Sequence, residues 1–307
     1  KRQIGLYHPT ENVAGEIYDA LIQVQHRGQD AAGIAAINKN KLSVHKDLGV
    51  VTEVFKTVES LDLKGNVGIG HVRYPTAGCS DVSEAQPFHT INPVEICLAH
   101  NGTLTNSDEM REFLLNKKFC KFNTQSDSEV LLNLFAYELS QTSFEVLESF
   151  HVFSALKEVY KRCEGGFAVA VLVEGVGLVG FRDSNGIRPL VLGKKDDGSF
   201  MVASESSALS ALGYIFESDI NPGEAIIISE QGGVERKTCS ENVSHTPCLF
   251  EFVYFSRPDS IIDSISVHKA RLRMGDFLGE KILKNHSELQ IDLSLIHISE
   301  PTRRRGI

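Results

Sequence analysis

The sequence has little of what marks several large classes of protein. No apolar run approaches the roughly 20 residues of a transmembrane helix. Basic residues are in deficit, with 31 Lys+Arg against 40 Asp+Glu and a net charge of −9, which argues against a general nucleic-acid-binding role. The six cysteines form no Cys-x-x-Cys pair, so a zinc ribbon or a disulfide framework is disfavoured. We therefore expect a cytoplasmic protein of enzyme size without nucleic-acid or membrane partners.

The spacing of apolar residues predicts both helices and strands. The 307 residues suffice for one large domain or two ordinary ones. A first helix is predicted from Val13 to Val24, with Gly28 placed to end it. Further helices are predicted near 107–114, from the capping-box pattern Ser126–Glu129, over Phe150–Arg162 and over Ser266–Ile282. The β-rich runs are Val67–Val72, Ile96–His100, Phe167–Val173, Leu178–Phe181 and Ala225–Ser229.

The order of these elements favours an α+β fold. Strands and helices do not alternate one for one, so a doubly wound parallel sheet is not favoured, and a layered arrangement is expected instead. The polar stretch 230–247 is typical of a connector, and an aromatic-rich run follows it from Leu249. We place a domain boundary near residue 240.

Four short segments carry side chains suited to chemistry, and each also has an ordinary structural explanation. Taken alone, Asn101-Gly102 is first of all a tight-turn dipeptide. Asp127 is typical of a capping-region carboxylate, and Arg73 of a solvated charge at a strand end. His26-Arg27-Gly28 is compatible with a helix C-terminus that carries favourable cations.

Taken together, the same residues fit a site for a free α-amino acid. An arginine fork binds a carboxylate in a bidentate manner and an aspartate binds an ammonium, so Arg73 and Asp127 suit the two ends of the ligand. The side-chain amide of Asn101 and the backbone N–H of Gly102 can both donate to one developing oxyanion. No nucleophile is evident from the pattern.

In this order, the segments resemble the class II glutamine amidotransferases and, among them, the amidophosphoribosyltransferase family. The resemblance extends to about Asp292. The matching stretches are Leu21–Ala35, Gly68–Gly78, Ala85–Phe88, Leu98–Asn106, Ser126–Glu129, Phe181–Leu192, Val202–Ser206 and Phe250–Ser260. The first five occur across the class, whereas the last three point to this family.

The resemblance implies a fold and a set of site residues. The implied fold is the four-layer αββα sandwich of the N-terminal-nucleophile hydrolases. Arg73 is implied to bind the α-carboxylate of L-glutamine, and Asp127 its α-ammonium. Asn101 and Gly102 are implied to form the oxyanion hole. The residues implied to line the pocket and its glutamine loop are Arg27, Gly28, Tyr74 and Thr76.

The start of the chain departs from the family pattern. The family has an N-terminal Cys whose thiol attacks the amide and whose α-amino group is the general base. Lys1 stands at that place and cannot form a thioester, so the chain as written is expected not to hydrolyse glutamine. Either the glutaminase is inactive, or the first codons were lost or misread. Cys79 lacks the terminal amine and is interpreted as an ordinary thiol.

The resemblance also implies a second domain of which only the beginning is present. In the intact enzyme, an α/β phosphoribosyltransferase domain binds phosphoribosyl pyrophosphate with Mg²⁺. Some relatives hold an iron–sulfur cluster with a Cys at the place of Cys248, but cluster-free relatives also have a Cys there, so both alternatives stay open. The glutaminase part implies no metal and no cofactor. A homo-oligomer is implied by resemblance alone.

Three segments are therefore expected: a glutaminase domain over 1–240, the start of the transferase domain over 241–292, and an unrelated tail over 293–307. Leu293–Arg303 resembles the translation of a transposon-type sequencing adapter, so we leave the tail out of the fold. Two rival functions stay open beside ammonia transfer to phosphoribosyl pyrophosphate. One is another class II amidotransferase, such as a sugar-phosphate amidating enzyme, and the other is a glutamine-binding regulatory module without catalysis.

Overall fold

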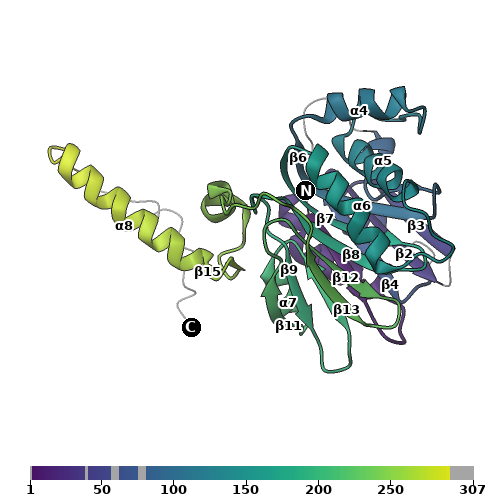
Figure 1. Ribbon diagram of the computed structural model, residues 1–307. Coiled ribbons are helices and arrows are strands. Elements are labelled where there is room, and N and C mark those ends of the chain that lie inside the picture. The colour runs from purple at the N-terminus through teal and green to yellow at the C-terminus, as the bar shows by residue number, and fades with distance from the viewer. Residues whose placement is uncertain (1, 39–40, 57–61, 75–80, 291–307) are drawn as a thin grey trace.

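Two antiparallel sheets dominate the computed structural model, which describes residues 2–38, 41–56, 62–74 and 81–290 (Figure 1). The strands of the seven-stranded sheet are, in spatial order, β11 (Ile215–Asp219), β9 (Val191–Lys194), β10 (Phe200–Ala203), β1 (Arg2–Tyr7), β4 (Val67–Arg73), β2 (Ala31–Asn38) and β3 (Lys41–Leu48). Those of the six-stranded sheet are β13 (Val234–Thr238), β12 (Glu224–Ser229), β8 (Gly177–Arg182), β7 (Gly165–Val173), β6 (Ile96–Leu104) and β5 (Phe88–Thr90).

Helices pack on both sheets. The seven-stranded sheet shares a core with α1 (Ala14–Val24), α2 (Val51–Val54) and α7 (Ser206–Ala211). The six-stranded sheet shares one with α4 (Ser107–Asn116), α5 (Asp127–Ser140) and α6 (Ser149–Arg162). Two 3-10 turns complete this part, η1 (Gln25–Arg27) and η2 (Val82–Glu84). In the described ranges, no helix combines the length and apolar composition needed to cross a bilayer.

Side chains that alternate between the two faces of each strand divide the hydrophobic core into separate clusters. On β7, Val169 and Val171 join the cluster that contains the helices, whereas Ala168 and Ala170 belong to the cluster between the two sheets. Successive side chains of a strand point to opposite faces, so one apolar run can serve both clusters. Small residues on the inner faces suit the close packing of one sheet on the other.

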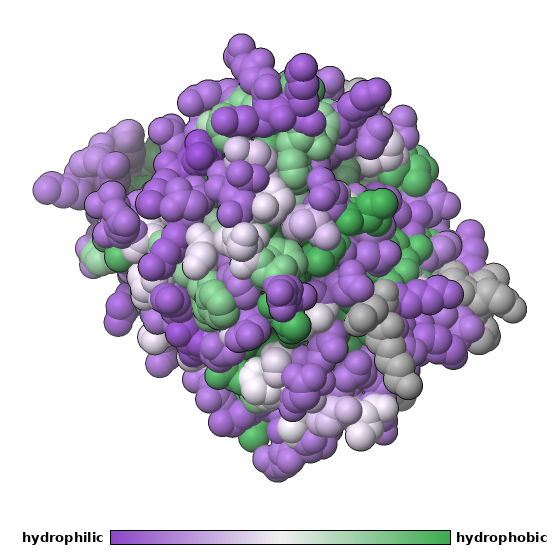
Figure 2. All heavy atoms as spheres, turned by 45° about the vertical axis from the view of Figure 1, so that its right-hand side comes forward, coloured by the Kyte–Doolittle hydropathy of each residue, from purple (hydrophilic) through white to green (hydrophobic). Residues whose placement is uncertain are grey.

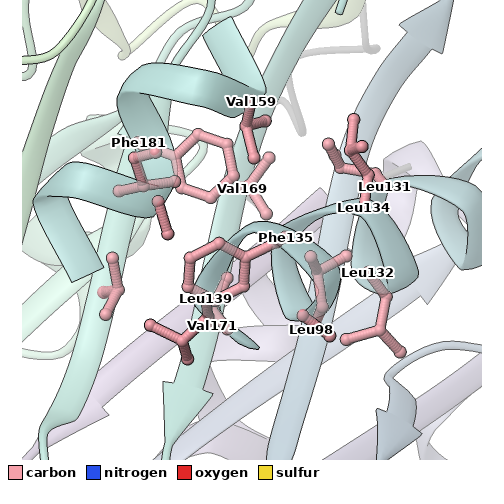
Figure 3. Close-up of a cluster of buried hydrophobic side chains, with 14 of the residues drawn as sticks. Leu98, Leu131, Leu132, Leu134, Phe135, Leu139, Val159, Val169, Val171 and Phe181 are labelled. Carbon is pink, nitrogen blue, oxygen red and sulfur yellow. The ribbon is translucent and has the colours of Figure 1, made fainter. Parts of the chain in front are cut away.

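Helix α5 lies at the centre of the largest cluster. Figure 3 shows its Leu134, Phe135 and Leu139 packed against side chains of the neighbouring helix and of the sheet, among them Val159 and Val169. Every residue from Ser128 to Ala136 is buried, which agrees with a helix that is apolar on nearly all sides. This burial holds the N-terminus of α5 fixed against the sheet.

Most predicted elements are confirmed, with a few instructive exceptions. The predicted strands and helices all exist, usually one to four residues longer than expected. The first helix ends at Val24, and the turn η1 precedes Gly28, so Gly28 does not end the helix itself. The polar stretch 230–247 is not only a connector, because it contains the exposed edge strand β13. Several strands were not predicted, among them the eight-residue β2 and β3 as well as the short β9 and β10.

The chain after residue 240 packs back on the sheets before it leaves them. It forms the π-helical turn η3 (Glu251–Phe255), the two-stranded β14 (Ile261–Ile262) and β15 (Ile265–Ser266), and the helix α8 (Val267–Asn285). Figure 1 shows α8 extending away from the two sheets. Its exposed apolar side chains include Leu272, Phe277 and Leu278. On the face drawn in Figure 2, hydrophilic residues predominate and apolar ones are scattered.

A buried ion pair fixes the turn between β14 and β15. The guanidinium of Arg182 donates to Asp263 Oδ1 at 2.7 Å and to Oδ2 at 2.9 Å. Burial raises the pKa of Asp263, but the hydrogen bonds and charge of Arg182, together with His245, outweigh it and hold the pKa below its usual value. Asp263 has φ of 47°, a conformation that Asn also adopts readily.

We predict that Asp263→Asn lowers the free energy of unfolding by about 3 kcal/mol at pH 7, because it leaves the buried Arg182 without its counter-charge. A carboxyl whose pKa is lowered by folding stabilises above its unfolded pKa of about 3.9, and that stability is lost as the pH falls through the folded pKa. The difference between the two proteins should therefore shrink below about pH 4. Urea unfolding from pH 7 to pH 3 measures this, with the exposed Asp276→Asn as control. A difference independent of pH would contradict it.

Candidate functional site

The pair Asn101-Gly102 lies inside a strand and not in a turn. Strand β6 runs on to Leu104, with Asn101 opposite Ala168 and Gly102 opposite Phe167 of β7. The tight-turn interpretation is therefore wrong. Gly102 has φ of +157°, and a Cβ added there would lie 2.1 Å from the carbonyl oxygen of Gly166. The glycine thus allows the two strands to stay paired where a side chain would force them apart.

Arg73 ends β4 in the interior of the seven-stranded sheet. It is 5% exposed and its Nε lies 3.5 Å from Asp30 Oδ2, so the interpretation as a solvated edge charge is wrong. The N–H of Asp30 donates to the carbonyl of Arg73 at 3.1 Å. A Cβ on Gly28 would lie 2.7 Å from the carbonyl carbon of Arg73. Gly28 therefore permits the close approach of these two segments, although its own backbone is extended.

Asp127 opens α5 next to the end of β6. Its Oδ2 accepts the N–H of Leu104 at 3.0 Å, which ties the helix start to the strand that carries Asn101 and Gly102. Ser126 caps the helix by accepting the N–H of Ser128 at 3.2 Å. The helix start is thus as predicted.

The capping box that the sequence predicts at this helix start is only half formed, because the side chain of Glu129 does not bind the N–H of Ser126. The carboxylate of Glu129 accepts the N–H groups of Asn123 and Thr124 at 2.9 and 2.8 Å instead of that of Ser126. Its Oε2 also accepts the hydroxyl of Thr124 at 2.7 Å. Glu129 therefore orders the loop in front of the helix, a role that residue spacing alone does not distinguish from a capping box.

A cavity of about 470 Å³ gathers residues from distant parts of the chain. Four of the eight residues implied by the sequence line it: Arg27, Tyr74, Asn101 and Gly102. The other lining residues are Arg2, His26, Thr103, Arg188, Tyr254 and Phe255. Gly28, Arg73 and Asp127 are not among the lining residues, and each is linked to the cavity through the segments described above. Thr76 and Lys1 lie outside the described residues.

Arg27 is a buried member of an ion-pair cluster. It donates to Glu251 Oε2 at 2.7 Å and also pairs with Glu205 Oε1. Its guanidinium lies 5.2 Å from the ring centroid of Phe255, within the range of a cation–π contact. Arg27 is 7% exposed and its charge is compensated by two carboxylates. The alternative that it is only a cation at a helix C-terminus is therefore wrong.

The carboxylate of Glu205 stays ionised in this cluster. Burial raises its pKa, but the hydrogen bond with His26 and the charge of Arg2 lower the pKa overall. Sequence reasoning did not single out Glu205, Glu251 or Arg188. Each of the three lies in one of the stretches that point to the narrower family, so the sequence marks these positions. The pattern alone assigns them no chemical role.

Four described cysteine thiols are unsuited to nucleophilic attack. Burial raises the pKa of Cys97 and of Cys163 to about 12, and that of Cys120 and of Cys239 to about 11. A thiol with so high a pKa carries almost no thiolate at neutral pH. Cys79, interpreted from the sequence as an ordinary thiol, lies outside the described residues.

The described residues do not form a complete metal site. Within the described ranges, no three His, Cys, Asp or Glu side chains lie together so that they could hold a metal ion. Cys248 is half-buried, and its N–H donates to the carbonyl of Ile187 at 3.3 Å. One thiol does not satisfy an iron–sulfur cluster. The Mg²⁺ and the cluster implied by resemblance stay predictions.

Known proteins resemble this chain over most of its length. Residues 71–211 match the family described as glutamine amidotransferase domain. The amidophosphoribosyltransferase of Escherichia coli is 51% identical over 282 residues, which cover 90% of this chain and 56% of that protein. The one from Schizosaccharomyces pombe is 44% identical over 294 residues, which cover 91% and 55%. The chain belongs to the amidophosphoribosyltransferase family.

Solved structures of amidophosphoribosyltransferases also resemble the chain. The glutamine phosphoribosylpyrophosphate amidotransferase of B. subtilis, complexed with ADP and GMP, matches with a TM-score of 0.79 and 34% identity, over 91% of this chain and 58% of that one. A second structure, of the allosteric regulatory enzyme of purine biosynthesis, has a TM-score of 0.81. The chain spans 55 to 60% of the length of the first amidophosphoribosyltransferases that it matches.

We predict that Gly102→Ala costs clearly more stability than Gly175→Ala. Both glycines have positive φ, but the added Cβ at Gly175 meets open space, whereas at Gly102 it meets the backbone of β7. The control should lose about 1 kcal/mol from backbone strain, and Gly102→Ala a further 1 to 3 kcal/mol from overpacking. Urea unfolding followed by circular dichroism measures both. Equal losses would show that the close approach at Gly102 is not needed.

Proposed function

We propose that the chain is the glutamine-hydrolysing part of a glutamine-dependent amidophosphoribosyltransferase. In the intact enzyme, glutamine and water give glutamate and ammonia, and ammonia reacts with phosphoribosyl pyrophosphate to give 5-phosphoribosylamine. The observation that carries the proposal is that Asn101, Gly102, Arg27 and Tyr74 line one cavity. Membership of the family supports the reaction, and favours it over other class II amidotransferases.

The proposed roles follow from the chemistry of the side chains. Attack on the amide carbonyl of glutamine places negative charge on its oxygen, and the Asn101 amide with the Gly102 N–H would donate to it. Arg73 would hold the α-carboxylate and Asp127 the α-ammonium. The ion pair of Arg73 with Asp30 supports its role, because it holds the guanidinium in place before a ligand arrives. Gly28 would act through the backbone of Arg73, and Thr76 would complete the pocket.

The remaining expectations are proposals of the same kind. The two sheets with their helices would be the αββα sandwich of the N-terminal-nucleophile hydrolases, and the chain after residue 240 would begin the phosphoribosyltransferase domain. Phosphoribosyl pyrophosphate and Mg²⁺ would bind the intact enzyme. A homo-oligomer and a cytoplasmic location are proposed on the resemblance alone.

We predict that a Lys1→Cys variant, processed so that the Cys is the first residue, releases ammonia from glutamine, whereas the chain with Lys1 does not. The thiol would supply the nucleophile and the terminal amine the base. Coupled glutamate dehydrogenase measures the ammonia, and Lys1→Ser is the matched control with a weaker nucleophile. If the Cys variant binds glutamine and releases no ammonia, the catalytic proposal fails and the glutamine-binding regulatory module is favoured.

We also predict that Arg73→Lys raises the dissociation constant for L-glutamine at least tenfold, because an ammonium cannot replace the planar fork. Isothermal titration calorimetry measures the constant in the chain as it stands. Arg273→Lys, at an exposed position of α8, is the control and should leave the constant unchanged. An unchanged constant in Arg73→Lys would remove Arg73 from the glutamine site.

A further inference from the structure

Two buried carboxylates lie behind the cavity, and they come from parts of the chain that the glutamine motifs do not include. Glu205 and Glu251 are each 1% exposed. Glu205 directly precedes α7, and Glu251 opens η3. Both lie beyond residue 190, whereas Asn101, Gly102 and Arg27 belong to the first half of the chain. Buried carboxylates are rarely retained without a cationic partner, so their surroundings indicate what they do.

Glu251 contacts three guanidinium groups of the cavity wall. Its Oε2 accepts from Arg2 at 2.8 Å and from Arg27 at 2.7 Å, while its Oε1 accepts from Arg188 at 3.0 Å. The hydroxyl of Ser256 donates to Oε2 at 3.1 Å. All three arginines line the cavity. One carboxylate therefore connects the wall formed by η1 and β1 with the wall formed by the loop after β8.

Glu205 contacts the same wall from the other side. Its Oε1 lies 3.3 Å from Arg2 Nε and also pairs with Arg27. Its Oε2 accepts the N–H of Arg257 at 3.1 Å and the hydroxyl of Ser260 at 3.0 Å. Glu205 thus ties the segment that follows η3 to the arginines of the cavity.

The aromatic part of the wall depends on these arginines. Phe255 lies with its ring centroid 5.2 Å from the guanidinium of Arg27 and 5.8 Å from that of Arg188. Phe255 and the 76%-exposed Tyr254 line the cavity from the η3 side. Because Glu251 binds both guanidinium groups, it also bears on the position of the ring that they contact.

We propose that Glu251 is a positioning residue of the glutamine site, which acts through Arg27 and Arg188 to hold the η3 segment as one wall of the pocket. The inference rests on the proposed function and adds a part of the chain to it. The pocket is not complete at residue 240, where the sequence places the end of the glutaminase domain, since η3 contributes Tyr254 and Phe255. Without the carboxylate, the buried arginines repel one another and the ring loses its support.

The test is the affinity for L-glutamine of Glu251→Gln, which keeps the shape of the side chain and removes its charge. Isothermal titration at 15 °C, far below the melting transition recorded for the same sample, reports only folded protein. We expect the dissociation constant to rise at least tenfold. Asp259→Asn is the matched control, because its exposed carboxylate lies in the same segment and pairs with Arg257. The control should stay within twofold of the unaltered chain.

Arg188→Gln keeps the proposal testable if Glu251→Gln does not fold. The side chain of Arg188 is more exposed than that of Glu251, so Arg188→Gln should destabilise the fold less. Arg188→Gln should also weaken the binding of L-glutamine. If Glu251 acts through Arg188, the two changes together raise the dissociation constant by less than the product of their single effects. A purely structural role would lower the melting temperature and leave the constant of the folded protein unchanged, which would overturn the proposal. If the unaltered chain binds no glutamine, the proposed function fails instead.

Discussion

Charge compensation among buried side chains holds the wall of the cavity together. Arg2, Arg27 and Arg188 surround it, and Glu205 and Glu251 lie between them at hydrogen-bond distance. Burying a charged group costs a large desolvation free energy, and only close partners with good geometry offset this cost. The segments that carry these five residues are therefore held in one arrangement, and the start of β1, the turn η1 and the loop after β8 are fixed relative to η3.

The fold supplies a rigid base for this cluster. Three apolar layers, one between the sheets and one on each outer face, leave the strand ends as the places where polar side chains can gather. Asn101 and Gly102 lie in the last part of β6, which stays paired with β7 beyond its apolar run Ile96–Ala99. Asp127 is tied there by the N–H of Leu104, and Arg73 by Asp30. The first link joins a side chain to the backbone of a strand, and the second joins two side chains from neighbouring segments.

The sequence predicted the long helices and the most apolar strands, but it predicted neither the strands β1, β2 and β3 nor the contacts of the site. A long run of apolar residues at helical spacing, such as that of α5, forms a helix whatever it packs against. The existence of such an element therefore follows from the sequence pattern. Asn101-Gly102 was ambiguous because a turn and a close strand approach both require glycine, and only the partner Gly166 decides between them. Glu205 and Glu251 are 46 positions apart, so no local pattern could reveal that they share Arg27. The resemblance located four of the cavity residues, but not the carboxylates behind them.

If Gly102 faces bound glutamine, as proposed, its backbone amide should respond to the ligand, and a selectively labelled sample resolves that one amide. The chain contains only two Asn-Gly pairs, Asn101-Gly102 and Asn185-Gly186. Labelling with carbonyl-¹³C asparagine and ¹⁵N glycine therefore leaves two peaks in an HNCO spectrum, and Asn185→Asp removes one of them for assignment. On titration with L-glutamine, we expect the amide signal of Gly102 to shift in a saturable manner and more than that of Gly186. Saturable binding by calorimetry with an unmoved Gly102 peak would contradict it.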